Sequence, residues 1–149
     1  MPAIIGNNEV ISSREFDAPR EVVYQAWTTP ELLARWWGPK GFTNTFHEFD
    51  LRPGGAWRFD MHGPNGANYP NHIIFTEIVP PERIVFDHIS KPEFRVTASF
   101  EDRNGRTLIT YRQQFKHSRE FELAKTYCVE GNEQNFDRLC ELLAERSAL

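Results

Sequence analysis

The chain has 149 residues, a length that suits one domain of common size. Its 17 Lys and Arg against 21 Asp and Glu give a net charge of −4, which argues against a general nucleic-acid binder and against a protein of anionic membrane surfaces. Hydrophobic residues make up 40% and charged residues 26%, a balance typical of globular rather than disordered proteins. We therefore expect one domain over residues 1–149.

The sequence also predicts where the protein resides. No apolar run approaches the ~20 residues that span a bilayer, and the N-terminus lacks the basic start and long apolar core of a secretory signal. Cys128 and Cys140 fall in one predicted helix, about 18 Å apart along its axis, which is too far for a disulfide. Two free thiols suit a reducing compartment, so we expect a cytoplasmic protein.

The first part of the chain predicts one strand and two helices. Residues 9–16 have the pattern of a strand. Pro19 suits the first turn of a helix, and apolar residues recur after it at helical spacing. Thr29-Pro30-Glu31 repeats this signal with Thr29 as the cap, and the second helix should end at Gly38-Pro39.

Alternating apolar and polar residues then predict about six consecutive strands joined by turns. These strands are residues 42–51, 56–62, 71–79, 84–88, 94–100 and 106–115. Pro53-Gly54-Gly55 is a glycine-rich turn, and Asn104-Gly105 is the dipeptide favoured in β-hairpins. After His117 the spacing becomes helical and continues to the C-terminus, with Gly131 expected to loosen or bend the helix.

This order of elements predicts an α+β fold. Strands joined by short turns must be mostly antiparallel, and such a sheet has one apolar face to cover. The amphipathic C-terminal helix is the only predicted element large enough to cover that face. We therefore expect a sheet packed against one long helix, with two short helices after the first strand.

Six motifs are specific enough to indicate a family. They are Ala18-Pro19, Thr29-Pro30-Glu31-Leu32, Arg35-Trp36-Trp37-Gly38-Pro39, Leu51-Arg52-Pro53-Gly54-Gly55-Ala56-Trp57-Arg58-Phe59, Ile78-Val79-Pro80-Pro81-Glu82-Arg83-Ile84 and Glu130-Gly131. Together they resemble the START-like (SRPBCC) superfamily, and within it bacterial proteins similar to the C-terminal domain of the activator of heat-shock-protein-90 ATPase. The resemblance runs from about residue 10 to about residue 145. The basic segment Phe115-Lys116-His117-Ser118-Arg119 departs from the usual pattern.

The resemblance implies a helix-grip fold, in which a curved antiparallel sheet of about six to seven strands wraps a long C-terminal helix and often leaves a cavity. Trp36 and Trp37 have two interpretations in such a fold. They either anchor the second helix against the rim of the sheet or line the mouth of the cavity.

Neither a metal site nor a cofactor is predicted. His47, His62, His72, His88 and His117 have no metal-ligand spacing, and there is no Cys-x-x-Cys. No phosphate-binding Gly-rich loop and no Gly-x-Ser-x-Gly elbow is present. Cys128 would be a nucleophile only beside a base that the sequence does not identify.

Strand alternation predicts which polar side chains face the helix. His88 shares a face with Ile84 and Phe86, and Gln113 shares a face with Tyr111. An apolar cavity with a few polar groups is typical of a small-molecule site. The predicted ligand-binding residues are Trp57, Phe59, Met61, Phe86, His88, Tyr111, Gln113, Tyr127 and Cys128. The alternative is that these aromatic residues simply fill the core.

Three functions follow as expectations. The first is binding of a small apolar or aromatic molecule, with a role related to stress. The second, implied by the superfamily, is a polyketide cyclase- or hydratase-like enzyme in which His88 and Glu77 form a His–carboxylate pair. A buried Glu77 would pair with Arg95 or Arg112 only if a β-bulge reversed the strand's alternation. The third, implied by the family resemblance, is an interaction protein that activates a chaperone ATPase, and a homodimer is also compatible with the sequence.

Overall fold

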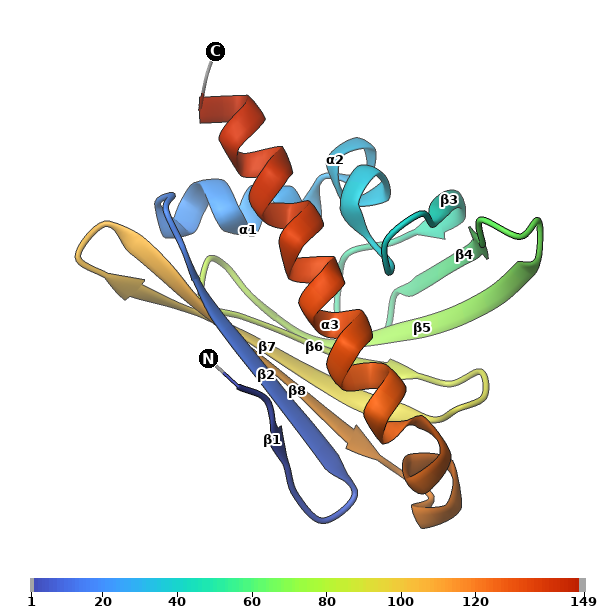
Figure 1. Ribbon diagram of the computed structural model, residues 1–149. Coiled ribbons are helices and arrows are strands. Elements are labelled where there is room, and N and C mark those ends of the chain that lie inside the picture. The colour runs from blue at the N-terminus through green and yellow to red at the C-terminus, as the bar shows by residue number, and fades with distance from the viewer. Residues whose placement is uncertain (1, 148–149) are drawn as a thin grey trace.

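The computed structural model describes residues 2–147 of the chain. Its strands are β1 (Ile4–Ile5), β2 (Glu9–Phe16), β3 (Thr43–Phe49), β4 (Ala56–His62), β5 (Asn68–Val79), β6 (Arg83–His88), β7 (Phe94–Arg103) and β8 (Arg106–Phe115). Its helices are α1 (Arg20–Thr28), α2 (Pro30–Trp36) and α3 (Ser118–Ser147). The strands form one 8-stranded sheet in the order β1-β2-β8-β7-β6-β5-β4-β3, and neighbouring strands are antiparallel throughout (Figure 1).

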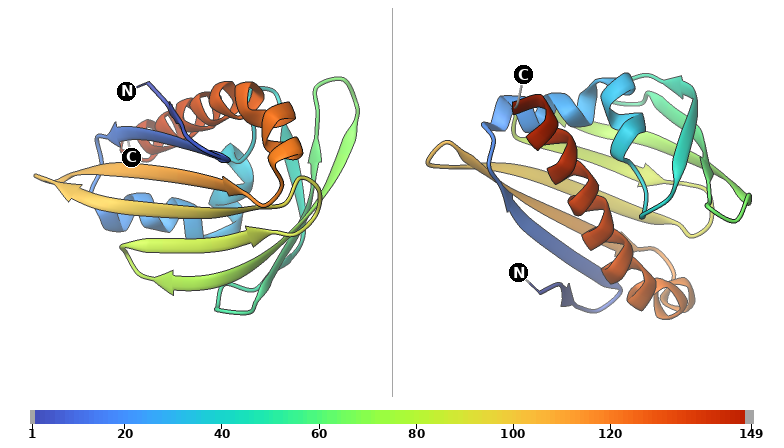
Figure 2. Two further views of the ribbon diagram at one scale, coloured as in Figure 1. Left: turned by 90° about the horizontal axis from the view of Figure 1, so that it is seen from below. Right: turned by 45° about the horizontal axis from the view of Figure 1, so that its top comes forward.

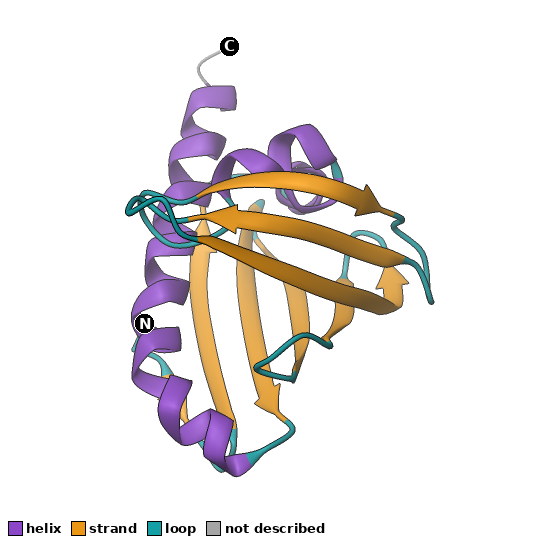
Figure 3. Cartoon of the chain, turned by 90° about the vertical axis from the view of Figure 1, so that its right-hand side faces the viewer, coloured by secondary structure: helices purple, strands orange, loops and turns teal. Residues whose placement is uncertain are grey.

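The sheet curls around α3, which confirms the predicted α+β helix-grip fold. Figure 2 shows the strands as a curved layer with α3 along its open side, and Figure 3 shows how strongly the sheet bends. The sheet has eight strands rather than six to seven because β1 pairs with Ile11 and Val10 of β2. A two-residue strand is too short to show an alternating pattern, so the sequence did not reveal β1.

The two short helices meet at Thr29. The prediction that the Thr29 side chain caps the second helix is wrong, because this side chain makes no capping hydrogen bond. Its backbone instead serves both helices, since its N–H donates to Gln25 of α1 and its carbonyl accepts from Leu33 of α2. Pro30 begins α2. Its missing N–H costs nothing at this position, because the first N–H groups of a helix have no acceptor within the helix. Trp36 then locks the pair together, because its indole N–H donates to the carbonyl of Ala26 at 3.0 Å.

A β-bulge in β5 settles the direction of its side chains. The register of β5 against β6 shifts between Phe75 and Glu77, so that Phe75 faces Phe86 while Glu77 faces Val85. A classic bulge changes the alternation by one residue. Ile73 and Phe75 therefore join the core before the bulge, and Ile78 packs against the core after it.

Helix α3 is anchored most firmly in its C-terminal half. It is continuous through Gly131, so this glycine does not interrupt the helix. Arg14 of β2 forms ion pairs with Glu133 and Asp137, at 2.8 and 2.7 Å. Arg138 donates hydrogen bonds to the carbonyls that end α2, those of Arg35, Trp37, Gly38 and Pro39. The N-terminal half has fewer ties, chiefly Phe121 packed with Val10 and Phe115.

Candidate ligand-binding cavity

A cavity of about 820 Å³ lies between the concave face of the sheet and α3. Its volume is within the range of small-molecule sites, roughly 300–1,000 Å³. Its walls come from β4, β5, β6, β7 and β8, from the loop after α2, from the loop between β6 and β7, and from residues 120–135 of α3. The space between the sheet and the N-terminal half of α3 is therefore a pocket, while the C-terminal half packs on a filled core.

Most of the residues predicted to bind a ligand share this cavity. Those that line it are Phe59, Met61, Phe86, His88, Tyr111, Gln113, Tyr127 and Cys128. The alternation of β6 and β8 turned His88 and Gln113 inward as expected, and both are buried. Tyr127 lies at the mouth, where 66% of its surface is exposed.

Trp57 is the exception, and its prediction as a lining residue is wrong. Its side chain is 2% exposed and belongs to the aromatic core behind the cavity. Its ring stacks on Phe59 at 4.5 Å between centroids, so that Phe59 lines the cavity in its place. Among the tryptophans it is Trp37 that lines the cavity, while Trp36 anchors α2. Trp36 thus anchors α2 to α1 rather than to the rim of the sheet, and Trp37 lines the buried wall beside Tyr111 rather than the mouth.

Several lining residues were not predicted. They include Asn71, Glu120, Leu123, Asn132 and Asn135. Asn71 lies near the start of β5, in the part of the strand that the sequence prediction barely reached. The remaining residues lie on α3, and which face of α3 is turned to the cavity depends on how this helix crosses the sheet. Helical periodicity identifies an apolar face, but polar residues beside that face give no comparable signal.

His88 is held by protein groups on both ring nitrogens. Nδ1 lies 2.8 Å from the carbonyl oxygen of Pro92, and Nε2 lies 2.6 Å from Oδ1 of Asn71. The ring stacks on Phe94 at 4.5 Å between centroids. Burial lowers the pKa of His88, an effect partly offset by its hydrogen bonds to the backbone of Pro92 and Ser90 in the following loop and by the charge of Glu120. With both nitrogens engaged, His88 fixes the loop at the cavity wall and is not poised as a free base.

Glu77 does not form the expected pair with His88. His88 faces Ile73 across the β5–β6 ladder, on the concave side, whereas the bulge places Glu77 opposite Val85 on the outer side. There Glu77 forms an ion pair with Arg83 rather than with Arg95 or Arg112. The carboxylate that does line the cavity is Glu120, which accepts a hydrogen bond from the backbone N–H of Glu93. The His88–Glu77 hypothesis of acid–base catalysis is therefore wrong in its geometry.

The cavity wall carries two groups that stay uncharged at neutral pH, Tyr111 on β8 and Cys128 on α3. Burial raises the pKa of the Tyr111 hydroxyl well above its ordinary value, and the nearby Cys128 thiol adds to this. Burial also raises the pKa of Cys128 to about 11, against a lowering contribution from the Gln113 side chain. A thiol with so high a pKa is a poor nucleophile. These residues suit binding better than covalent catalysis.

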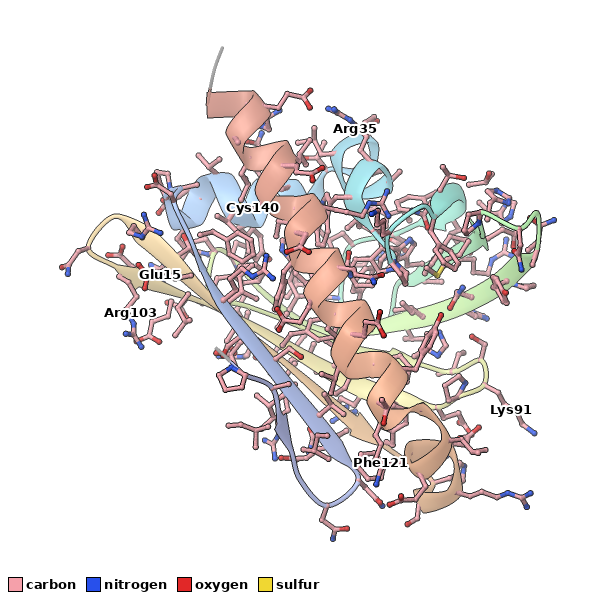
Figure 4. The ribbon with its side chains drawn as sticks, viewed as in Figure 1. Glu15, Arg35, Lys91, Arg103, Phe121 and Cys140 are labelled. Atoms are coloured by element: carbon pink, nitrogen blue, oxygen red, sulfur yellow. The ribbon has the colours of Figure 1, made fainter. Side chains whose placement is uncertain are left out.

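The mouth of the cavity combines exposed apolar side chains with the charged Lys91 and Glu120. Leu123 and Tyr127 on α3 and Tyr69 on β5 line it and are 80%, 66% and 46% exposed. Lys91 stands in the loop between β6 and β7 and extends into solvent near the N-terminal end of α3 (Figure 4). An apolar molecule would thus meet matching surface before it entered.

Within residues 2–147, no three His, Cys, Asp or Glu side chains gather closely enough to hold a metal ion. Over the same residues, no helix has the length and apolar character needed to cross a membrane. Cys128 and Cys140 are both free thiols, in line with their predicted separation.

The buried His88 predicts a loss of stability in mild acid. Its pKa is lowered in the folded state from an ordinary value of 6.5, so the unfolded chain takes up this proton first. The free energy of unfolding should fall as the pH drops below about 6.5. We expect His88→Gln, which keeps polar atoms near Asn71, to show a shallower fall. Urea unfolding between about pH 7.5 and about pH 5.5 measures both slopes, and equal slopes would contradict the role of His88.

The curved sheet, the gripped helix and the cavity define the class: the chain is a helix-grip protein of the START-like type. The family model described as "Activator of Hsp90 ATPase homolog 1-like protein" matches residues 17–144, and the chain belongs to that family. This confirms the resemblance drawn from the sequence motifs. No curated protein matches the chain significantly.

Solved structures of bacterial proteins share the fold. A crystal structure from Nitrosomonas europaea is 24% identical with a TM-score of 0.88, covering 98% of this chain and 100% of the other. A solution structure from Arthrobacter aurescens is 24% identical with a TM-score of 0.89, covering 96% and 91%. A crystal structure from Mycobacterium smegmatis is 23% identical with a TM-score of 0.88, covering 98% of each chain. At these identities the likeness concerns the fold alone.

Proposed function

We propose that this protein binds a small apolar or aromatic molecule in the cavity between its sheet and α3. The observation that carries the proposal is the cavity itself, about 820 Å³ in volume and walled mainly by aromatic and aliphatic side chains. Burying such a molecule against Phe59, Phe86 and Ile73 removes apolar surface from water, which is the main favourable contribution to binding. Binding is also favoured over catalysis because His88 and Cys128 lack the features of a base or a nucleophile.

Native mass spectrometry of freshly purified protein tests this function. We expect an adduct of a few hundred daltons that disappears when the protein is denatured, because a ligand of this class stays only in the folded cavity. As a control, Ala124→Trp on the cavity wall of α3 should fill the space and remove the adduct. A bare mass for the wild type, together with no rise in melting temperature across a broad library of apolar compounds, would refute the proposal.

The cytoplasmic location, the link to stress and the possible homodimer stay predictions. The chaperone-activating role that the family's description suggests is a separate prediction. A pull-down with a purified chaperone of the heat-shock-protein-90 class would test it without involving the cavity.

A further inference from the structure

The inner end of the cavity carries polar groups that the described part of the chain leaves unpaired. Tyr111, Asn132 and Asn135 line both the cavity and a narrow gap that reaches the buried Trp27 and Trp36. Since Trp27 and Trp36 belong to the core, these three residues mark the deep end. The mouth lies at the other end of the cavity. There Phe115, which is four residues beyond Tyr111 on β8 and so about 13 Å from it, pairs with Phe94 of β7.

Tyr111 is the clearest of these groups. Only 6% of its surface is exposed, and it lines the cavity. Among residues 2–147 its hydroxyl has no hydrogen-bond partner, although the ring packs against Trp27 and Trp37. Unlike the hydroxyl of Tyr24, which is buried without a partner, the hydroxyl of Tyr111 is reachable from the cavity, where water or a ligand can bond to it. The hydroxyl can therefore bond to whatever occupies the cavity.

The two asparagines add a donor and an acceptor beside it. Nδ2 of Asn132 donates to Gln113 at 2.9 Å and to Ser12 at 3.3 Å, which fixes its amide. Oδ1 of Asn135 accepts from the backbone N–H of Gly38 at 3.2 Å. Within the described chain, the second polar atom of each carboxamide makes no hydrogen bond. The deep end thus offers both donors and an acceptor.

The deep end is also uncharged. Among the described residues that line the cavity, only Lys91 and Glu120 carry full charges, and both belong to the mouth, beside the loop between β6 and β7. Burying a carboxylate without a cation is strongly unfavourable. An alkyl chain pushed inward is also unfavourable, because it would leave the polar groups without water and without partners.

We infer that the cavity takes an uncharged ring compound bearing a hydroxyl or carbonyl group, and that this group enters first and bonds to Tyr111 at the deep end. The inference rests on the proposed function and specifies its ligand class and orientation. The apolar remainder then lies toward Phe94 and the exposed Leu123 and Tyr127. Tyr111 is the specificity-determining residue, because its O–H rejects a ligand that brings no acceptor.

Three probes that share a naphthalene ring test the inference by equilibrium dialysis: 2-naphthol, 2-methylnaphthalene and 2-naphthoate. We expect 2-naphthol to bind about tenfold more tightly than 2-methylnaphthalene, the ratio that one net hydrogen bond gives, and 2-naphthoate to bind most weakly. Tyr111→Phe keeps the packed ring and removes the hydroxyl. It should weaken 2-naphthol about tenfold and leave 2-methylnaphthalene unchanged.

Tyr24→Phe is the matched control, because it removes a buried hydroxyl from a tyrosine that packs against Phe100 and does not line the cavity. It should leave the affinity of all three probes unchanged. Tightest binding of 2-naphthoate, or equal binding of 2-naphthol to the wild type and to Tyr111→Phe, would overturn the inference while leaving the proposed function intact. If none of the probes binds, the inference is wrong, and the native mass decides separately whether the cavity holds another ligand.

Discussion

Leu139→Ala should lower the free energy of unfolding by about 3 kcal/mol, the usual cost of removing a buried leucine and leaving a cavity. Leu139 is 0% exposed and lies in the core cluster beneath the C-terminal half of α3. The Arg14 and Arg138 contacts hold α3 in place on either side of it, so the helix cannot settle into the space. Urea unfolding at neutral pH measures the difference.

The same substitution on the same helix provides the control. Leu123 is 80% exposed at the cavity mouth, so Leu123→Ala should change the unfolding free energy by no more than about 0.5 kcal/mol. Equal losses for the two variants would show that α3 is not anchored as the structure indicates. Because both changes cost the same helix propensity, the difference between them isolates the contribution of packing.

Gly55→Ala is expected to be still more damaging, at about 3 kcal/mol or more. A Cβ at Gly55 would lie 2.0 Å from the carbonyl oxygen of Asp50, a backbone atom that cannot move aside alone. The same turn is tied to β5 by two hydrogen bonds, since Gly54 N–H donates to Phe75 and Phe75 N–H donates to Gly55. Relieving the clash would therefore disturb the strand that carries the cavity wall.

Gly54→Ala separates this steric effect from ordinary backbone strain. Gly54 has a φ of 84°, yet a Cβ there would have nothing within 4 Å. Gly54→Ala should therefore lower the free energy of unfolding by only about 1 kcal/mol, the cost of placing alanine in a left-handed conformation. Thermal and urea unfolding of both variants give the ranking, and a Gly55→Ala protein as stable as Gly54→Ala would show that the turn is looser than described.

The strands could be predicted well from the sequence because their pattern is local. The alternation around Phe86 and Tyr111 is enough to assign His88 and Gln113 to the concave face, where both line the cavity. The Asn104-Gly105 turn also follows from local chemistry, because both residues adopt the positive φ that such a hairpin requires.

The errors arose where tertiary structure changes a local pattern. A bulge at one point of β5 moved Glu77 to the outer face, and the sequence allowed such a bulge without locating it. Trp57 points inward as its strand pattern indicates, but Phe59 stands between it and the cavity. Inward direction and access to a ligand are different properties, and alternation predicts only the first.

The polar end of the cavity lay beyond prediction for a related reason. Asn132 and Asn135 belong to α3, and their side chains reach the cavity only because that helix crosses the sheet near the loop after Trp37. Tyr111 was predicted as a lining residue. Whether its hydroxyl finds a hydrogen-bond partner, however, depends on all the residues that surround it in the folded protein, and the sequence does not show those.

The tryptophans of the aromatic core extend from the cavity wall into the interior of the protein. All four tryptophans form one chain of neighbours, with ring centroids 4.9 Å apart for Trp27 and Trp36, 5.5 Å for Trp36 and Trp37, and 5.1 Å for Trp37 and Trp57. Indoles this close exchange excitation energy. Among them only Trp37 lines the cavity, so we expect a ligand that quenches Trp37 to lower the emission of its neighbours as well. Intrinsic tryptophan fluorescence should therefore report whether the cavity is occupied.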